Sequence, residues 1–172
     1  DFTGGPHFSW GLALPWGALD FAPPAVEGGC ALSDEWVTAP APGVIPRSEL
    51  AMVILDLDGD GDQRTGWVLF FFHIAERDRI PEGTEVEQGD FLGHPSCEGG
   101  RSTGTHVHIA RLYNGEWIPA AGVLPFTMDG WVAGYGETPY EGTLTKVSKT
   151  VRASTETTMQ NQIIYTLPTP QP

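Results

Sequence analysis

The stretch WVLFFFHI, residues 67–74, contains the longest apolar run of the chain and indicates the class of fold. In a strand its side chains alternate, with residues 67, 69, 71 and 73 on one face and residues 68, 70, 72 and 74 on the other. Both faces are apolar, so we expect this strand to lie in the middle of a sheet or sandwich, covered on both sides. His73 is the single polar group of its row, and taken alone it would be a satisfied core or edge histidine.

Turn-forming residues divide the rest of the chain into short segments. The sequence contains 22 Gly and 15 Pro, and the β-branched or aromatic runs between them are only a few residues long. We therefore expect an all-β domain, mainly antiparallel sheet or sandwich with long Gly- and Pro-rich loops, and little helix. The predicted strands are residues 36–39, 43–45, 52–56, 67–74, 91–93, 106–111 and 116–118.

Length and composition predict how the chain is organised. Its 172 residues suffice for one domain with a substantial core. We assign residues 1–150 to that domain and residues 151–172 to a terminal strand followed by a linker or tail, because the last segment is rich in Thr, Gln and Pro. The chain begins at Asp1 rather than at Met, which we interpret as a processed or trimmed form.

The charge of the chain argues against several kinds of partner. Nine Lys and Arg stand against 22 Asp and Glu, for a net charge of -13, and no basic cluster is present to displace counterions from a phosphate backbone. We therefore expect no nucleic-acid partner and no binding to anionic membranes. No apolar stretch has the length of a membrane-spanning helix, so we also expect no membrane insertion and a soluble, monomeric protein.

Two cysteines, Cys30 and Cys97, allow one bridge. An acidic chain with two cysteines is compatible with an oxidising compartment without requiring one. The pair forms either a disulfide or two inert buried thiols.

The clearest chemical signal is the segment STGTHVHI, residues 102–109, which places His106 and His108 two positions apart in a β-branched run. On a strand the two imidazoles share one face, where they can bind a metal, move protons or divide these tasks. Near the start of the chain, GGPH ends in His7 and ALDFA contains Asp20. Two histidines and an aspartate form a three-ligand set that leaves one zinc position open for water.

These residues are where the chain resembles the M23 family of zinc metallopeptidases, the LytM and lysostaphin-like peptidoglycan endopeptidases. The resemblance spans about residues 4–117. Within it, FHI at residues 72–74 is followed by the glycine-containing run 83–93 and then by residues 99–108. This order is similar to the glycine turns that precede the Ser-Thr-Gly-x-His-x-His signature of that family.

The resemblance implies a LytM-like all-β fold and a role for each of five residues. His7, Asp20 and His108 correspond to the zinc ligands of the family, and His73 and His106 correspond to its catalytic pair. The resemblance also implies hydrolysis of peptide bonds in bacterial cell-wall peptidoglycan. A secreted or cell-envelope protein would carry out this reaction outside the cytoplasm.

The chain departs from the family pattern at one place. Twelve residues, 8–19, separate His7 from Asp20, whereas lysostaphin-like members hold the two ligands only a few residues apart. The insertion contains Trp10 and Trp16. It forms an aromatic loop at the rim of a substrate groove, or else His7 is not a ligand.

The chemistry of these groups suggests how such a site would work. Zinc would lower the pKa of a bound water and polarise the scissile carbonyl. The chain has no His-Glu-x-x-His motif, so another group must take the proton of the water. We expect His106 to do so and His73 to stabilise the oxyanion or protonate the leaving amine, with the assignment of the two roles left open. His94 has no counterpart in the family scheme, and we interpret it as structural.

A second candidate metal site is the segment DLDGDGD, which places Asp56, Asp58, Asp60 and Asp62 at alternate positions between two strands. Oxygen ligands in a tight glycine-containing loop suit calcium. An EF-hand would need Glu at its twelfth position, where Trp67 stands, so the segment is no EF-hand. The alternatives are a calcium loop and a plain acidic hairpin turn.

Two other classes of function compete with a peptidase. A LytM-like domain that acts as a non-catalytic wall-binding, glycan-binding or regulatory module would fit the acidic, tryptophan-containing composition, but the complete ligand set argues against it. A cupin-type metal oxygenase would need a further histidine well after the His-x-His pair, and no His follows His108.

Overall fold

The computed structural model describes residues 1–24, 28–156 and 158–163. These residues form fourteen strands and no helix, so the predicted all-β, mainly antiparallel fold is confirmed. The described part of the chain accordingly has no helix that could span a membrane. In chain order the strands are β1 (Phe2–Phe8), β2 (Trp16–Phe21), β3 (Val37–Thr38), β4 (Gly43–Glu49), β5 (Met52–Asp56), β6 (Trp67–Phe72), β7 (Glu85–Val86), β8 (Phe91–Gly93), β9 (Val107–Tyr113), β10 (Glu116–Ile118), β11 (Thr127–Met128), β12 (Trp131–Tyr135), β13 (Gly142–Lys146) and β14 (Lys149–Arg152).

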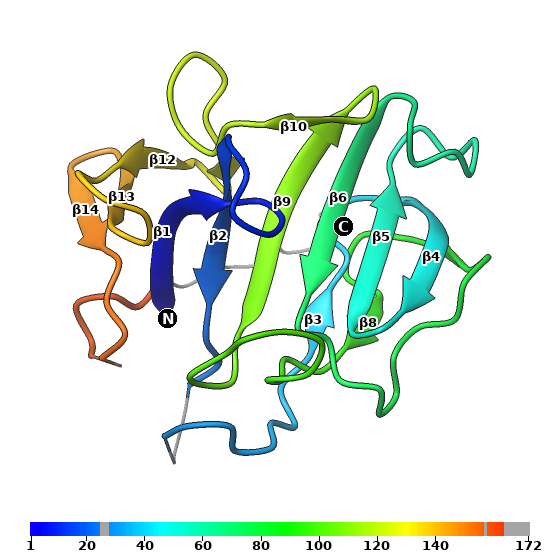
Figure 1. Ribbon diagram of the computed structural model, residues 1–172, viewed down its shortest axis with the longest axis horizontal. Helices are drawn as coiled ribbons and strands as arrows, with labels where there is room; N and C mark the ends of the chain where they lie inside the picture. The colour runs from blue at the N-terminus through cyan, green and yellow to red at the C-terminus, as the bar shows by residue number, and fades with distance from the viewer. Residues whose placement is uncertain (25–27, 157, 164–172) are drawn as a thin grey trace, which may run out of the picture.

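The main sheet has eight strands. Seven of them follow one another in the order β1, β2, β9, β6, β5, β4, β7, and β10 pairs with β9. All of these pairings are antiparallel. Figure 1 shows β9 and β6 side by side in the middle of the molecule, with β2 and β5 beside them.

Strand β6 lies between β5 and β9, as its two apolar faces predicted. Leu69 and Phe71 pack into the larger hydrophobic core of the protein. Val68 and Phe70 point to the other face and pack into a second, smaller core. Burial on both faces explains why this segment is an unbroken apolar run.

The predicted strand 67–74 is too long by two residues, and this part of the prediction was wrong. Strand β6 ends at Phe72, and His73 has a φ of +63°, in the left-handed region. The chain therefore turns at His73, which does not continue the row of Leu69 and Phe71. Because of this turn, the imidazole of His73 does not point into the core and lies instead at the end of the strand.

Six strands were not predicted, namely β1, β2, β7 and β11–β13, whereas β14 overlaps the start of the segment predicted to begin with a terminal strand. Strand β1 contains Gly4, Gly5 and Pro6, which favour turns. It is a strand because it lies at the end of the main sheet, where proline and irregular pairing are tolerated, and its register with β2 shifts three times. The predicted ends at 36–39, 43–45 and 106–111 differ from the observed strands by one to four residues.

A second sheet, in the order β11-β12-β13-β14, lies beside β1, at the left of Figure 1. Gly5 contacts the connection between β12 and β13, where its N–H donates to the Tyr140 carbonyl at 2.7 Å. A Cβ on Gly5 would overlap the backbone of Glu141, so only glycine permits this approach. Leu144 and Val151 extend the larger core into the second sheet.

The predicted boundary at residue 150 falls inside β14. After that strand the chain returns to β1, where the buried Asn161 donates to the carbonyls of Phe2 and Ser154. The division of the chain at this point stays a prediction. Residues 164–172, most of the predicted tail, lie outside the described residues.

Cys30 and Cys97 form a disulfide. The bridge joins the segment before β3 to the loop between β8 and β9, which leads to the His-x-His pair. The Thr105 N–H donates to the Gly29 carbonyl at 2.9 Å, and the Thr105 hydroxyl donates to the Ala31 carbonyl. The two segments are therefore held together at several points.

Candidate metal centre

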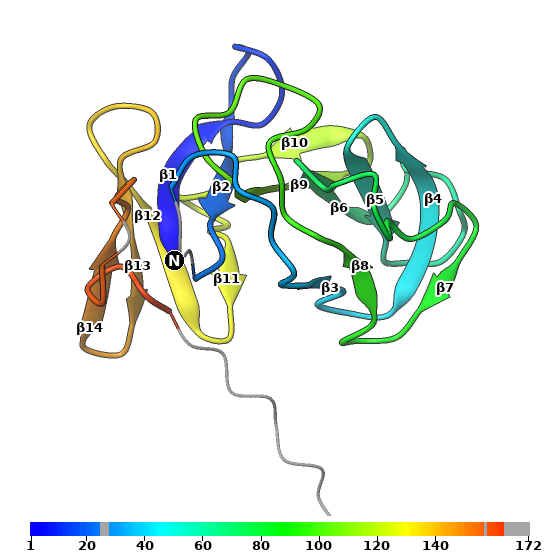
Figure 2. The same ribbon diagram turned by 90° about the horizontal axis from the view of Figure 1, so that it is seen from below.

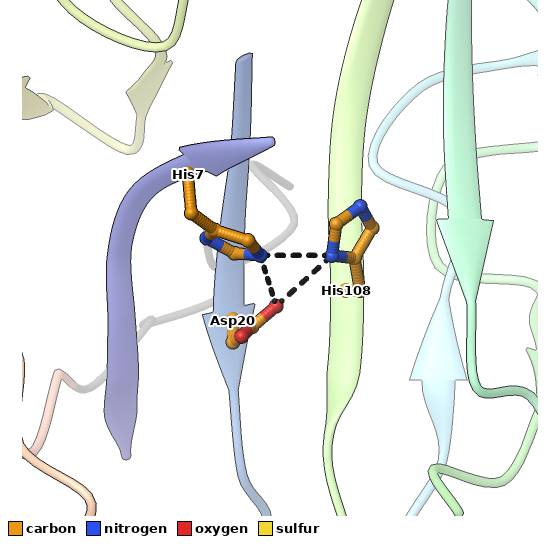
Figure 3. Close-up of side chains that lie close together, drawn as sticks. All are labelled: His7, Asp20 and His108. Atoms are coloured by element: carbon orange, nitrogen blue, oxygen red, sulfur yellow. Dashed lines mark hydrogen bonds and ion pairs between the residues drawn. The ribbon is translucent and has the colours of Figure 1, made fainter. Parts of the chain in front are cut away.

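Three neighbouring strands carry the residues that correspond to zinc ligands. His7 lies near the end of β1, Asp20 near the end of β2 and His108 near the start of β9. Asp20 and His108 are paired directly in the register of β2 and β9. Because β1 and β2 form a hairpin, His7 folds back beside Asp20 despite the twelve residues between them. Figure 3 shows the three side chains pointing toward one another.

The three candidate ligand atoms form a compact triangle. His7 Nε2 lies 3.0 Å from His108 Nδ1, and Asp20 Oδ1 lies 3.2 Å from each of these nitrogens. In a tetrahedral zinc site with ligands at about 2.05 Å, neighbouring ligand atoms are about 3.3 Å apart. The separations are close to those of three corners of such a tetrahedron.

Backbone carbonyls determine which nitrogen of each ring is free. His7 Nδ1 lies 2.8 Å from the Gly5 carbonyl, and His108 Nε2 lies 3.1 Å from the Ser9 carbonyl. A carbonyl oxygen only accepts, so these two nitrogens carry the protons and donate them. The other nitrogen of each ring then presents a lone pair to Asp20 Oδ1. Bonds of this kind orient the histidine ligands of metal sites.

Asp20 provides the strongest indication of a cation. Its Oδ1 is buried and has no hydrogen-bond partner in the described part of the chain. A charged carboxylate and two nitrogen lone pairs in contact repel one another unless a cation lies between them. A set of two imidazoles and one carboxylate suits zinc.

Two adjacent glycines serve this group in different ways. A Cβ on Gly4 would lie 2.6 Å from Asp20 Oδ2, so Gly4 provides the space for the carboxylate. Gly5 provides the space for the second sheet and also offers the carbonyl that orients His7. The sequence pattern Gly-Gly-Pro-His thus has a packing reason at each glycine.

His73 and His106 lie beside the triangle. Their ring centroids are 4.5 Å apart, and His106 Nε2 is 3.8 Å from Asp20 Oδ1. His73 Nδ1 donates to the Glu98 carbonyl at 2.7 Å, and His106 Nδ1 donates to the Gly104 carbonyl at 2.8 Å. Each ring therefore presents Nε2 as a free acceptor. Burial lowers the pKa of His73 to about 4, which keeps this imidazole neutral.

A groove with a volume of about 1100 Å³ passes over these residues. One wall is formed by residues 8–12, at the start of the β1–β2 connection, and the other by residues 99–105. Figure 2 shows both connections rising from the same side of the main sheet. Trp10, 51% exposed, lies edge-on against Phe70 and Phe72. The insertion that separates the first two ligands therefore lines the groove.

Sequence reasoning missed Tyr140. Its ring stacks on His7, with centroids 4.2 Å apart, and it lines the groove. Burial and the Asp20 carboxylate raise the pKa of Tyr140, so its hydroxyl stays protonated and can donate. No motif marks this residue, because it reaches the site only through the packing of the second sheet against β1.

His94 lies away from the groove. Its ring packs on Trp36, with centroids 3.9 Å apart, and its Nδ1 donates to the Glu35 carbonyl at 2.8 Å. These contacts connect the segment before β3 to the end of β8.

The acidic segment forms the loop between β5 and β6. Asp56, Asp58 and Asp60 each place one carboxylate oxygen within 4.8 Å of the others, and Asp62 does not belong to this group. The carboxylates accept from backbone N–H groups of the loop itself, as Asp56 Oδ2 does from Gly61 at 2.8 Å. Such bonds are those of an acidic hairpin turn, and nothing in the described residues supports calcium there.

No protein-family model matches the chain. Among curated proteins, Protease LasA of Pseudomonas aeruginosa, from two strains, is 32% identical over 65 residues. The match covers 34% of this chain and 15% of LasA, so it spans less than a sixth of that protein.

Solved structures give a similarity over most of the chain. Pseudoalterin, an M23 metalloprotease from the deep sea, matches with a TM-score of 0.71 and 24% identity over 88% of each chain. Lysostaphin of Staphylococcus simulans, an antimicrobial peptidase, matches with a TM-score of 0.44 and 18% identity over 88% of this chain and 75% of its own. The chain therefore shares its fold with the M23 metalloprotease pseudoalterin, as the resemblance in its sequence implied for the fold.

Proposed function

We propose that this protein is a zinc-dependent metalloendopeptidase that hydrolyses peptide bonds in bacterial cell-wall peptidoglycan. The observation that carries the proposal is the triangle of His7, Asp20 and His108, which directs three acceptor atoms at one point on the floor of an open groove. His73 and His106 beside it supply two groups for proton transfer. The likeness to pseudoalterin and LasA supports a metallopeptidase.

His7 Nε2, Asp20 Oδ1 and His108 Nδ1 would hold the zinc ion. Zinc, when bound, polarises a carbonyl oxygen and lowers the pKa of a coordinated water. His106 Nε2, a free acceptor 3.8 Å from Asp20 Oδ1, takes the proton of the attacking water.

Two steps remain, protonation of the leaving amine and stabilisation of the oxyanion, and His73 and Tyr140 are the candidates for them. With its Nδ1 proton on the Glu98 carbonyl, neutral His73 has no proton at Nε2 to offer an oxyanion. We therefore assign His73 to proton transfer toward the leaving amine, after its Nε2 has accepted the proton that His106 took from the water, and the Tyr140 hydroxyl to the oxyanion. This assignment replaces the role of oxyanion donor that the sequence left open for His73.

We further propose that the protein works as a monomer in a secreted or cell-envelope location. The disulfide between Cys30 and Cys97 supports an oxidising compartment. The groove has a volume of about 1100 Å³ and is lined by residues of two loops, which supports binding of an extended peptide substrate.

The test combines metal content with activity. Mass spectrometry of the purified protein should find about one zinc per chain, as a single three-ligand site requires. The His7→Ala, Asp20→Ala double variant should lose the zinc, and His94→Ala, which removes a buried histidine outside the groove, should keep it. Zinc-loaded wild type should release new amino groups from purified peptidoglycan, and the double variant should not. Zinc binding without cleavage would favour a non-catalytic wall-binding module, and no zinc after reconstitution would refute the metal site.

A further inference from the structure

The groove is lined by two side chains of opposite charge, one buried and one exposed. Among its described lining residues, Asp20 is the only Asp or Glu, and Arg101 is the only Lys or Arg. Asp20 is buried in the ligand triangle, whereas Arg101 is exposed on the groove wall. With a divalent cation in the triangle, the formal charge of the groove is positive, although the whole chain carries -13.

Arg101 also differs from most basic residues of the chain in having no partner in the described part of the structure. Seven of the nine have one: Arg47, Arg64, Arg77 and Lys146 form salt bridges, Arg79 and Arg111 donate to carbonyls, and Lys149 lies over the ring of Trp131. Arg152, the other exception, lies on β14 and does not line the groove. A guanidinium that has no partner among the described residues, on the wall of a groove, is available to a ligand.

The loop that carries Arg101 is anchored on both sides of this residue. Before it, a Cβ on Gly100 would lie 3.6 Å from His73 Cε1, so the backbone packs against that imidazole. After it, Ser102 Oγ lies 3.3 Å from His106 Nδ1. Arg101 thus extends from the backbone between contacts to the two histidines that we assign to proton transfer.

Arg101 lines the same groove as Tyr140 and the three candidate ligands. Tyr140 stacks on His7, so Arg101 and the candidate metal centre face one shared space. The planar guanidinium presents its N–H donors in a fork that matches the two oxygens of a carboxylate.

We propose that Arg101 is a specificity-determining residue that binds a carboxylate of the peptide substrate within a few residues of the scissile bond. The proposal rests on the proposed peptidase function and names its substrate class, peptides with an acidic side chain or a free carboxyl end near the cut. The cation and Arg101 attract such peptides into the groove, whereas the acidic surface elsewhere repels them.

The test uses matched peptides and the zinc-loaded full chain. In one series of fluorogenic Gly- and Ala-containing peptide amides, each position in turn carries Glu or its neutral isostere Gln. A second series ends in a free carboxylate or in an amide. The ratio of kcat/KM between the acidic and the neutral member of each pair is measured for wild type, Arg101→Gln and Arg101→Glu. The matched control Arg152→Gln removes one positive charge outside the groove.

We expect wild type to prefer the acidic member roughly five- to tenfold at one position or at the carboxyl end. Arg101→Gln should bring this ratio close to one, Arg101→Glu should invert it, and Arg152→Gln should leave it as in wild type. Raising the ionic strength to about 1 M, where the Debye length is about 3 Å, should reduce the wild-type ratio. The position of the preference shows whether a side chain or a chain end supplies the carboxylate. The proposal is overturned if no pair shows a preference in wild type, or if Arg101→Gln keeps it.

A binding measurement separates this proposal from the peptidase proposal. The dissociation constants of the same peptide pairs are followed by the fluorescence of the zinc-loaded protein, in which Trp10 lies in the groove. If no peptide is cleaved but the acidic member binds more tightly and loses this advantage in Arg101→Gln, the peptidase function fails and the carboxylate site stands. Equal affinities in wild type refute the carboxylate site whether or not peptides are cleaved.

Discussion

His7 Nε2 and His108 Nδ1 lie 3.0 Å apart, although 101 positions separate the two residues in the chain. Strand β2 lies between their strands and supplies Asp20 to the same point. Each ring uses its other nitrogen to donate to a backbone carbonyl, so both lone pairs converge on the carboxylate. The sheet has thus assembled an arrangement of acceptors that a cation stabilises.

Substitution of the two histidines of the His-x-His pair, His106 and His108, should affect zinc binding differently. His108→Ala removes one corner of the triangle and should abolish zinc binding and activity together. His106→Ala leaves the triangle intact, so it should keep its zinc and lose roughly 10²- to 10⁴-fold in kcat/KM, the range of a general base. Metal analysis and peptidase kinetics on the same preparations check this. Undiminished activity of the His106 variant would contradict its assignment as the general base.

Substitution of Gly4 should affect zinc binding, whereas substitution of the adjacent Gly5 should affect the stability of the fold. Gly4→Ala pushes its Cβ against the Asp20 carboxylate and should weaken zinc binding about 10- to 100-fold, as disturbance of a ligand's surroundings does. Gly5→Ala presses on the backbone of Glu141 and should destabilise the fold by about 1–3 kcal/mol. Zinc competition titrations and denaturant unfolding distinguish the two effects.

A matched control for this pair is Gly28→Ala, where an added Cβ meets nothing within 4 Å. Its zinc affinity and stability should equal those of wild type. If Gly4→Ala behaves in the same way, the carboxylate does not depend on that space.

The hydroxyl of Tyr140 should contribute to kcat, and its ring should contribute to zinc binding. Tyr140→Phe keeps the stacking on His7 but removes the donor, so it should lower kcat about 10²-fold with unchanged zinc content. Tyr140→Ala removes the ring as well and should also weaken zinc binding, because the packing that supports His7 is lost. Kinetics and metal titration of the two variants check this, and full activity of Tyr140→Phe would assign the oxyanion to another group.

The lowered pKa of His73 predicts how stability depends on pH. Burial moves this pKa from 6.5 to about 4, so between these values the unfolded chain binds more protons than the folded one. The free energy of unfolding therefore decreases as the pH falls from 6.5 toward 4, and His73 adds no pH dependence above this window. Wild type and His73→Gln are compared by denaturant unfolding across the window in the same metal state. The variant should lose less stability, and parallel curves would show that His73 titrates alike in both states.

The acidic loop between β5 and β6 should behave as a turn. Because the Asp56 carboxylate already accepts from Gly61 and Asp58 N–H groups, calcium has little to add there. Addition of calcium in the millimolar range to zinc-loaded protein should leave the melting temperature unchanged. A rise that disappears in Asp58→Asn would restore the calcium interpretation.

Several features were predictable because they depend on short-range periodicity. The spacing of His106 and His108 predicts that both imidazoles point to one side, because side chains alternate with a period of two. Both rings do lie near Asp20, although β9 begins only at Val107. The apolar residues at 67–72 predict a strand covered on both faces, and β6 lies in the middle of the main sheet. The predicted end of this strand was wrong because the alternation stops at His73. The positive φ of His73 cannot be predicted from a pattern of apolar residues.

Other features could not be read from the chain because their causes are non-local. Strand β1 looks like a turn from its glycines, yet it is a strand because β2 and the second sheet lie against it. Tyr140 and Arg101 belong to no local chemical motif and gain their position from the sheets and loops that carry them.

By itself the sequence determined the all-β class, the central strand and the set of histidines and aspartate with metal-binding chemistry, since these follow from residue type and spacing of neighbours. Only the tertiary structure decided that His7, Asp20 and His108 converge on one point, that a groove passes over them, and which side chains line it. The reason is physical: strand pairing and the close approach of two sheets at Gly5 join segments distant in sequence, and the contacts formed there exist only once the chain has folded.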